Sequence, residues 1–365
     1  MSLGSIAVSA ANAATQQPLM LAPPSLRPAP ISSLAVGRVR PLALRLPTDN
    51  RALLDGQPKS FFMGVDRTVD GQALLVWEGG QYGFVRNPFL LNGETVYTRF
   101  HEGIDIAPAL RDNQGEPLDL VCAISDGRVV FTSAQQRSSN YGNYVVIEHD
   151  WGYGPFYSLY GHLMRMDVQP AEIVKRGHVL GRLGYTGSGI DRRRAHVHLE
   201  LNILLNERFE QWHARLDPLQ PAQTPFHGFN LVGLDIAAIY KALAADPAIT
   251  IPQFLASQPV YFRVIAPSPR GELEILRRYP WLCGIPRSTK SNLVCPSWEI
   301  SFTASGLPLH FEPSEQHLPY PIVSSIVPFT GKHSWKTMGR VGGTDTAATL
   351  TPKGTEYVNL VMGAF

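Results

Sequence analysis

Cysteine, charge and long apolar runs are all scarce in this chain of 365 residues. The 3 cysteines are too few for a disulfide framework, and no two of them form a CxxC pair. Charged residues make up 17% of the chain, and 32 Lys and Arg against 30 Asp and Glu leave a net charge of +2. So weak a field argues against a protein that binds nucleic acid or an anionic membrane by bulk charge. No apolar run approaches the roughly 20 residues of a transmembrane helix, so no membrane span is predicted.

Glycine and proline are abundant, with 32 and 30 copies. Both favour turns and interrupt regular elements, so the sequence predicts a mostly β chain with few long helices. The hydrophobic fraction of 44% is sufficient for a sizeable core and excludes wholesale disorder. At about 150 residues per domain, the length corresponds to two or three domains.

The first 50 residues differ in composition from the rest of the chain. Met1 to Ala14 is apolar and small, and Ala11-Asn-Ala13 resembles a signal-peptidase site. This pattern predicts a leader-like segment and export to the periplasm or the cell exterior, with a plain flexible N-terminus as the alternative. Residues 15–50 are rich in proline, which predicts an extended linker or an arm along the next domain.

The remaining chain divides near residue 222. Residues 51–222 contain short β-like runs separated by Gly, Asn, Asp and Pro, which predicts an antiparallel β domain. In residues 223–365, Asp235 is a plausible N-cap of a helix that ends before Pro247, and strand-like runs follow. We therefore expect a β-rich accessory domain with one or two helices. Its two cysteines, Cys283 and Cys295, either form a bridge or remain buried thiols.

The segment from Arg99 to Pro108 places a histidine and an aspartate at a spacing of four. On a strand, where side chains alternate, His101 and Asp105 share one face, and Gly103 between them leaves room for a ligand. For this pair alone, a histidine hydrogen-bonded to a nearby carboxylate is the simpler interpretation.

Two further segments add imidazoles. Ala195-His196-Val-His198-Leu-Glu200 places two histidines on one strand face, and His162 follows a strand-like run. Two His and one carboxylate, without cysteine, fit a catalytic zinc site with three protein ligands and an open fourth position. Zinc there would lower the pKa of bound water to about 7, and the remaining histidines could accept its proton and stabilise an oxyanion.

In this order, the segments resemble the lysostaphin-like, LytM-type zinc metalloendopeptidases that cut the peptide part of bacterial peptidoglycan. The similarity covers roughly residues 80–220. It includes several further sequence blocks, among them Tyr82-Gly-Phe-Val-Arg86, which has one residue more than the family's F-G-x-R turn, Tyr141-Gly-Asn-Tyr-Val-Val-Ile-Glu-His149, Tyr160-Gly-His-Leu163 and Gly181-Arg-Leu-Gly-Tyr-Thr-Gly187.

The resemblance implies an antiparallel β-sheet groove domain of the duplicated-hybrid-motif type over residues 51–222. It implies that Zn²⁺ is bound by His101, Asp105 and His198. It also implies that His196 is the general base and that His162 positions the water or stabilises the tetrahedral intermediate. The expected protein is a secreted zinc metalloprotease whose partners are peptidoglycan peptides of the cell wall.

Three further interpretations stay open. A non-catalytic cell-wall-binding or amidase-activating protein could retain this fold and its metal. The N-terminal segment, over residues 15–95, could autoinhibit the enzyme by covering its groove. The basic loop Asp191-Arg-Arg-Arg194 could line the groove and meet a peptide carboxylate, or it could be a solvated loop.

Overall fold

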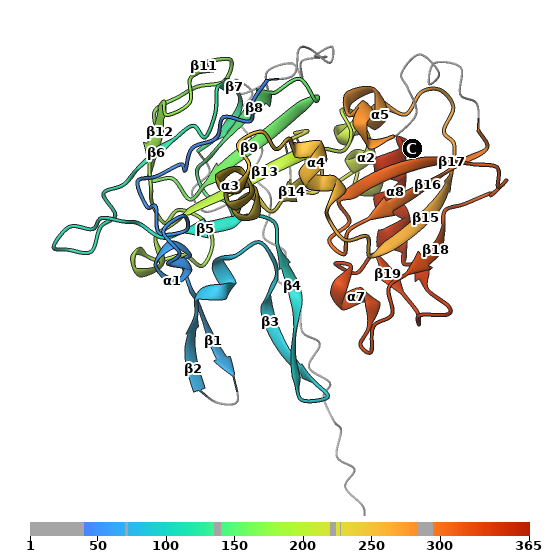
Figure 1. Cartoon of the computed structure of the whole chain (residues 1–365), viewed down its shortest axis with the longest axis horizontal. Coiled ribbons are helices and arrows are strands. Elements are labelled where there is room, and N and C mark those ends of the chain that lie inside the picture. Colours follow the sequence, from blue (N-terminus) through green and yellow to red (C-terminus); the bar gives the residue numbers. More distant parts are fainter. Residues whose placement is uncertain (1–39, 70–71, 135–139, 220–223, 227, 284–294) are drawn as a thin grey trace, which may run out of the picture.

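A computed structural model describes residues 40–365 apart from 70–71, 135–139, 220–223, 227 and 284–294 (Figure 1). The leader-like segment and its cleavage motif therefore lie outside the described residues. Within the described part, every helix is too short or too polar to cross a lipid bilayer.

A seven-stranded sheet forms the centre of the molecule (Figure 1). Its strand order is β11-β7-β8-β9-β13-β14, all neighbours are antiparallel, and β5 also pairs with β13. The strands are β5 (Ile104–Ile106), β7 (Gly127–Ser133), β8 (Tyr144–Asp150), β9 (Pro155–Gly161), β11 (Ile173–Val174), β13 (Val197–Leu204) and β14 (Leu231–Leu234). The predicted fold class, mostly β and antiparallel, is confirmed.

Both faces of this sheet are covered over β8, β9 and β13. Ile147 and Leu199 belong to the main core, whereas Val146 and Leu159 belong to a second cluster on the other face. Strands that are buried on both faces need apolar residues at successive positions, which explains the continuous apolar runs in the sequence.

Shorter strand pairs surround the sheet. A three-stranded sheet has the order β10-β12-β6, and two hairpins, β1-β2 and β3-β4, extend from the same side of the molecule (Figure 1). Their bounds are β1 (Val65–Val69), β2 (Gln72–Val76), β3 (Gly83–Leu91), β4 (Glu94–His101), β6 (Leu120–Cys122), β10 (Arg165–Met166) and β12 (Val179–Arg182). The short helices of this part are α1 (Pro58–Phe61), η1 (Trp77–Gly80), η2 (Arg192–Arg194) and α2 (Phe209–Leu216).

The chain before the first hairpin is part of the core. The backbone N–H of Arg45 donates to the carbonyl of Ile124 (2.9 Å), and Phe61 is fully buried. The N–H of Met63 donates to the carbonyl of Asp105 (2.8 Å), so this segment supports β5 directly. Residues 40–63 are thus built into the domain that carries the predicted site.

The C-terminal region adds a four-stranded sheet and more helix than expected. The predicted helix is confirmed as α3 (Ile236–Ala245), whose N-cap Asp235 accepts a hydrogen bond from the N–H of Ala238. The sheet order is β17-β16-β15-β18. The elements of this region are α4 (Ile251–Ala256), β15 (Phe262–Pro267), α5 (Glu274–Arg278), η3 (Pro280–Leu282), β16 (Ser297–Phe302), β17 (Pro308–Ser314), β18 (Ile322–Ile326), α7 (His333–Lys336), β19 (Val341–Gly342), β20 (Thr349–Leu350) and α8 (Pro352–Met362).

This region packs on the central sheet. The Tyr279 hydroxyl donates to the carbonyl of Pro155 (2.7 Å) and accepts from the N–H of Leu204 (3.0 Å). Strand β14 extends the central sheet beyond residue 222, and the division into domains at that point stays a prediction. All three cysteines are buried, and none of them forms a disulfide bond.

A buried histidine stabilises the end of β8, remote from the predicted site. His149 is fully buried, donates through Nδ1 to the carbonyl of Asp126 (2.8 Å) and lies 2.7 Å from Ser158 Oγ through Nε2. Its ring stacks on Trp151. Burial lowers the pKa of His149 from 6.5 to about 4, because the surroundings disfavour the charged imidazolium.

We predict that His149 makes the fold sensitive to acid. The unfolded chain binds a proton near pH 6.5 and the folded chain only near pH 4, so stability falls as the pH drops through this window. Between pH 7 and pH 5, His149 should account for about 2 kcal/mol of lost unfolding free energy. Urea unfolding of the zinc-free protein at both pH values measures the total loss, and His149→Gln should reduce it by about 2 kcal/mol. Burial lowers the pKa of His101 and His162 as well, so these residues account for the remainder. His317→Gln, at an exposed histidine, is the control and should leave the loss unchanged. An unchanged loss in His149→Gln would contradict the assignment.

Candidate metal centre

Strand pairing brings the three predicted ligands together. β13 pairs with β5 at one edge and with β9 at the other, and His198 lies opposite both Asp105 and Gly161. His101 is the last residue of β4, and its ring centroid lies 5.0 Å from that of His198. All three side chains are buried, with at most 5% of each residue exposed.

The expectation that His101 and Asp105 share one strand is wrong. β4 ends at His101 and β5 begins at Ile104, so a turn separates the two residues. Gly103 in this turn passes so close to β13 that a Cβ would lie 2.4 Å from the carbonyl oxygen of Leu199. Glycine is therefore required for the close approach of the backbones, and the turn still directs both side chains to one point.

Three donor atoms converge at this point. Asp105 Oδ1 lies 3.1 Å from His101 Nε2 and 2.8 Å from His198 Nδ1, and the two nitrogens are 3.1 Å apart. The described residues contain one group of His, Cys, Asp and Glu that could bind a metal ion, and it consists of these three. Two imidazoles and one carboxylate are the ligand types of catalytic zinc sites.

The second nitrogen of each ligand histidine has its own acceptor. His101 Nδ1–H donates to the carbonyl of Gln81 (2.7 Å), and His198 Nε2–H donates to Glu200 Oε1 (2.8 Å). Since a carbonyl oxygen can only accept, the His101 proton is on Nδ1 and its Nε2 lone pair faces the other ligands. Hydrogen bonds of this kind fix the tautomer and orientation of metal-binding histidines.

An arginine orients the carboxylate ligand. Arg86 Nη2 donates to Asp105 Oδ2 (2.6 Å), and Arg86 Nε donates to the carbonyl of Gly79 (3.1 Å). The β3–β4 register shifts between Phe84 and Arg86, so Val85, the extra residue of this motif, forms a bulge. A bulge re-aims the next side chain, which here is Arg86.

Glu200 is itself held on both oxygens. The Tyr141 hydroxyl donates to Oε1 (2.8 Å) and Asn202 Nδ2 donates to Oε2 (3.0 Å). Burial opposes the charged carboxylate, but the hydrogen bonds and attraction to His198 lower the pKa of Glu200 below its usual value. Glu200 is therefore an ionised acceptor for His198.

The electrostatics of the three ligands favour a cation among them. Burial would lower the pKa of His198, yet its hydrogen bonds to Asp105 and Glu200 raise it to about 9. Burial likewise opposes ionisation of Asp105, but the imidazoles around this carboxyl lower its pKa well below the usual value. Burial lowers the pKa of His101 to about 4, so its ring is neutral.

A positive charge at this position is thus required by the residues themselves. Without a metal, a proton on His198 Nδ1 has to separate it from Asp105 Oδ1 and the lone pair of His101. A divalent cation can replace that proton and bind all three donors. The donor set therefore fits zinc.

The other two predicted histidines lie beside the ligands. His162 directly follows β9, and His196 directly precedes β13; their ring centroids are 4.6 Å apart. His162 Nδ1–H donates to the carbonyl of Thr186 (2.8 Å), and His196 Nδ1–H donates to the carbonyl of Arg194 (2.6 Å). Each Nε2 is therefore a lone-pair acceptor.

The two rings differ in their charge environment. His196 Nε2 lies 3.4 Å from Asp105 Oδ1. Burial, with repulsion from His196 and His198, lowers the pKa of His162 well below its usual value, so its ring is neutral. His162 adopts the left-handed backbone conformation (φ 65°), which turns its side chain out of the β9 alternation.

The structure thus brings all five predicted site residues together and adds partners that the sequence analysis did not assign. Gln81 acts through its backbone carbonyl, so its residue type in the sequence gives no indication of the contact. Arg86, Tyr141 and Glu200 all lie inside quoted motifs, so their presence was noticed, but their contacts come from chain segments far apart in sequence.

The fold and the site together define the class of this part of the chain, which is an antiparallel β domain with a His-Asp-His centre. Residues 99–210 match Peptidase family M23, and all five site residues lie within this segment. This match confirms the predicted resemblance over these residues.

Relatives are similar over this part of the chain. A "Lipoprotein NlpD/LppB homolog" of Pseudomonas aeruginosa is 33% identical over 136 residues, which is 37% of this chain and 39% of that protein. The chain therefore spans well under half of this curated relative.

Among solved structures, the catalytic domain of lysostaphin from Staphylococcus simulans is 27% identical, with 33% of this chain and 75% of that one covered (TM-score 0.23). A zinc-containing peptidase from Vibrio cholerae is 22% identical, with 39% and 35% covered (TM-score 0.25).

We predict that Glu200→Gln weakens zinc binding by roughly 10-fold to 100-fold, because His198 loses the charged acceptor that orients its ring. Competition with a chromophoric chelator measures the affinity. Glu148→Gln is the matched control, since Glu148 is also a buried carboxylate of the central sheet. Equal zinc affinity in Glu200→Gln and wild type would contradict this assignment.

Proposed function

We propose that this chain is an exported zinc-dependent endopeptidase that hydrolyses peptide bonds of bacterial peptidoglycan. The observation that carries the proposal is the convergence of His101 Nε2, Asp105 Oδ1 and His198 Nδ1, with two further imidazoles beside them. The M23 match of the same segment supports the peptidase class. Similarity to a lipoprotein homolog supports an extracytoplasmic location.

In this proposal, His101, Asp105 and His198 bind Zn²⁺. Bound zinc supplies a Lewis acid that polarises a carbonyl and lowers the pKa of water to about 7. Arg86 and Glu200 orient the ligands, since each binds the ligand atom that faces away from the centre.

His196 is proposed as the general base. When the ring is neutral, its proton is on Nδ1 and is donated to the carbonyl of Arg194, which leaves Nε2 as the acceptor. A proton taken up at Nε2 would lie beside Asp105 Oδ1, whose negative charge stabilises the imidazolium. The fixed ring orientation keeps this acceptor at the site.

His162 is proposed to position the attacking water. Its Nδ1–H is bound to the carbonyl of Thr186, and its neutral ring offers Nε2 as an acceptor. A neutral ring in this tautomer cannot donate to an oxyanion through Nε2. The hydrogen bond therefore favours the water-positioning role over oxyanion stabilisation.

The alternative is a non-catalytic cell-wall-binding or amidase-activating protein. Such a protein would need the fold, and a metal for stability, but neither imidazole outside the ligand set. The tautomers of His162 and His196, both fixed with a free Nε2, support the enzyme instead.

We predict that His196→Ala and His162→Ala each lose roughly 10²-fold to 10⁴-fold in turnover while they still bind zinc. Asp105→Ala should lose both zinc and activity, because it removes a ligand. Mass spectrometry of fragments released from several purified peptidoglycans, with and without a chelator, measures cleavage. His178→Ala, at an exposed histidine, is the control. If zinc-loaded wild type releases no fragments from any of the purified peptidoglycans, the proposed endopeptidase activity is refuted and the non-catalytic alternative is favoured.

Autoinhibition by the N-terminal segment, expected over residues 15–95, is a separate proposal, and we restrict it to residues 15–39. Residues 40–63 contain core positions such as Phe61, so their removal would disrupt the domain itself. We predict that a chain lacking residues 1–39 cleaves peptidoglycan with a higher kcat/KM than the full chain. Equal kcat/KM values for the two chains would contradict autoinhibition by this segment.

A further inference from the structure

The basic loop before His196 contains one arginine whose guanidinium group lacks a carboxylate partner. Arg192 lies 3.5 Å from Glu116, and Arg193 forms an ion pair with Asp66 of β1. Arg194, in contrast, contacts a carboxylate only through its backbone N–H, which donates to Asp191 Oδ1 (2.9 Å), and its guanidinium group forms no ion pair among the described residues. Its Nη1 reaches only the carbonyl of Gly189 (3.4 Å), and its buried Nε has no hydrogen-bond partner.

Two arginines on the hairpins also lack an ion-pair partner. Arg67 on β1 donates to the backbone carbonyl of Asp66, and Arg99 lies on β4 directly opposite Arg86 in the β3–β4 register. Within the described ranges, neither Arg67 nor Arg99 forms an ion pair. Like charges opposite each other on neighbouring strands destabilise a hairpin, so the pattern has a cost in the free chain.

These arginines form one cluster. Arg193, the neighbour of Arg194, pairs with Asp66, the neighbour of Arg67 on β1. Arg99 lies two residues after Tyr97 on β4, and Tyr97 lines the same pocket as Arg67. Besides partial burial, repulsion from Arg86, Arg194 and Arg99 also lowers the pKa of Arg67. Arg86 is neutralised by Asp105. Arg67, Arg99 and Arg194 remain, in a chain whose net charge is only +2.

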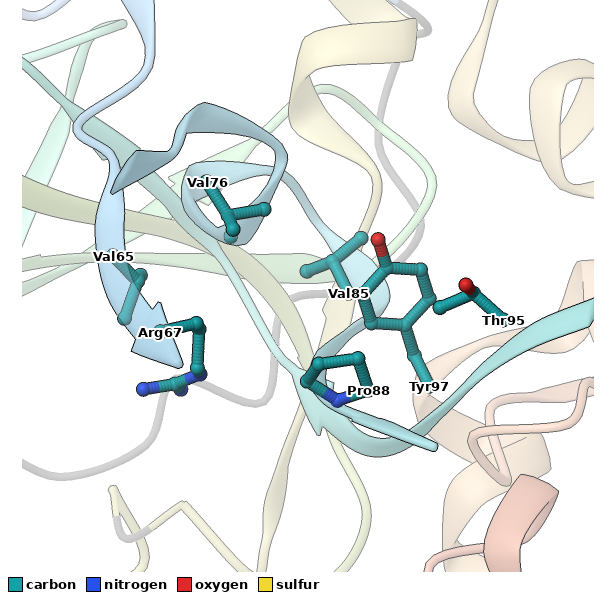
Figure 2. Close-up of a pocket in the computed structure, with 8 residues that line it drawn as sticks. Val65, Arg67, Val76, Val85, Pro88, Thr95 and Tyr97 are labelled. Carbon is teal, nitrogen blue, oxygen red and sulfur yellow. The ribbon is translucent and has the colours of Figure 1, made fainter. Parts of the chain in front are cut away.

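The cluster adjoins a pocket between the two hairpins. Figure 2 shows Arg67 on one side of this pocket and Val85, Pro88 and Tyr97 on the other. Gly79 also lines it, and its carbonyl accepts from the same Arg86 guanidinium that binds Asp105. One guanidinium group therefore separates the pocket from the metal centre.

The cluster is also connected to the proposed base. The backbone carbonyl of Arg194 binds Nδ1 of His196, so the unpaired guanidinium belongs to the residue that orients this ring. The residue that carries this guanidinium is therefore in direct contact with the proposed base.

We infer that Arg67, Arg99 and Arg194 bind a side-chain or terminal carboxylate of the peptide substrate, so that the site selects anionic peptides. Guanidinium groups bind carboxylates with paired, charge-assisted hydrogen bonds, and the apolar wall opposite Arg67 suits the aliphatic part of the same residue. This inference rests on the proposed function and specifies its substrate class.

The test compares two forms of one peptide pool. Soluble muropeptides are used either unmodified or after carbodiimide and ammonia have converted their carboxyl groups to amides. We expect zinc-loaded wild type to bind the unmodified pool at least 10-fold more tightly in calorimetry. Arg67→Gln, Arg99→Gln and Arg194→Gln should each reduce this preference severalfold, and the triple variant should abolish it. Arg176→Gln, at an exposed arginine remote from the hairpins, is the matched control.

The outcomes separate this inference from the proposed function. Equal binding of both pools by wild type, or a preference that persists in the triple variant, would overturn the carboxylate site. Cleavage of both pools at equal rates would also overturn it while leaving the endopeptidase intact. Arginine-dependent binding without any cleavage would instead support the carboxylate site and refute the enzyme. Bound zinc and unfolding midpoints of each variant exclude misfolding as the cause.

Discussion

The pairing of β13 with β5 and β9 is the constraint on which the site depends. Its register sets His198 opposite Asp105 at one edge and opposite Gly161 at the other, so His162 follows at the end of β9. A shift by one residue would turn His198 to the other face of the sheet, since side chains alternate along a strand. The buried apolar residues of β13 hold this register. The same register that packs the core therefore also places the metal ligands.

Hydrogen bonds around the site determine which nitrogen of each imidazole faces the centre. Backbone carbonyls bind one nitrogen of His101, His162 and His196, and Glu200 binds one nitrogen of His198. Every imidazole therefore presents its other nitrogen to a common space. Negative charge on Asp105 and Glu200 exceeds the positive charge of Arg86, which is why the buried centre favours a divalent cation.

Sequence patterns predicted the antiparallel β class and the meeting of the five site residues, because strand periodicity and His spacing are local signals. The turn between His101 and Asp105 was missed, since it depends on the close approach of Gly103 to Leu199, nearly a hundred positions along the chain. The contact of Gln81 with His101 has no side-chain signal at all. The sequence showed one residue more than the family's turn between Tyr82 and Arg86, but only strand pairing shows that Val85 forms a bulge that aims Arg86. The roles of the five residues stay predictions.

The β3–β4 hairpin links the C-terminal region to the metal centre. Helix α7 packs along it: the ring centroids of Phe89, near the far end, and Trp335 are 5.0 Å apart, and Lys336 lies over the ring of Phe84, near the metal centre. The near end of the hairpin supplies Arg86 and His101 to the centre. Because a two-stranded hairpin is marginally stable alone, contacts at its far end restrict the positions of these two side chains. The C-terminal region thus contributes to the site without supplying any of the five site residues, because it restricts the hairpin that forms one wall of the pocket in Figure 2.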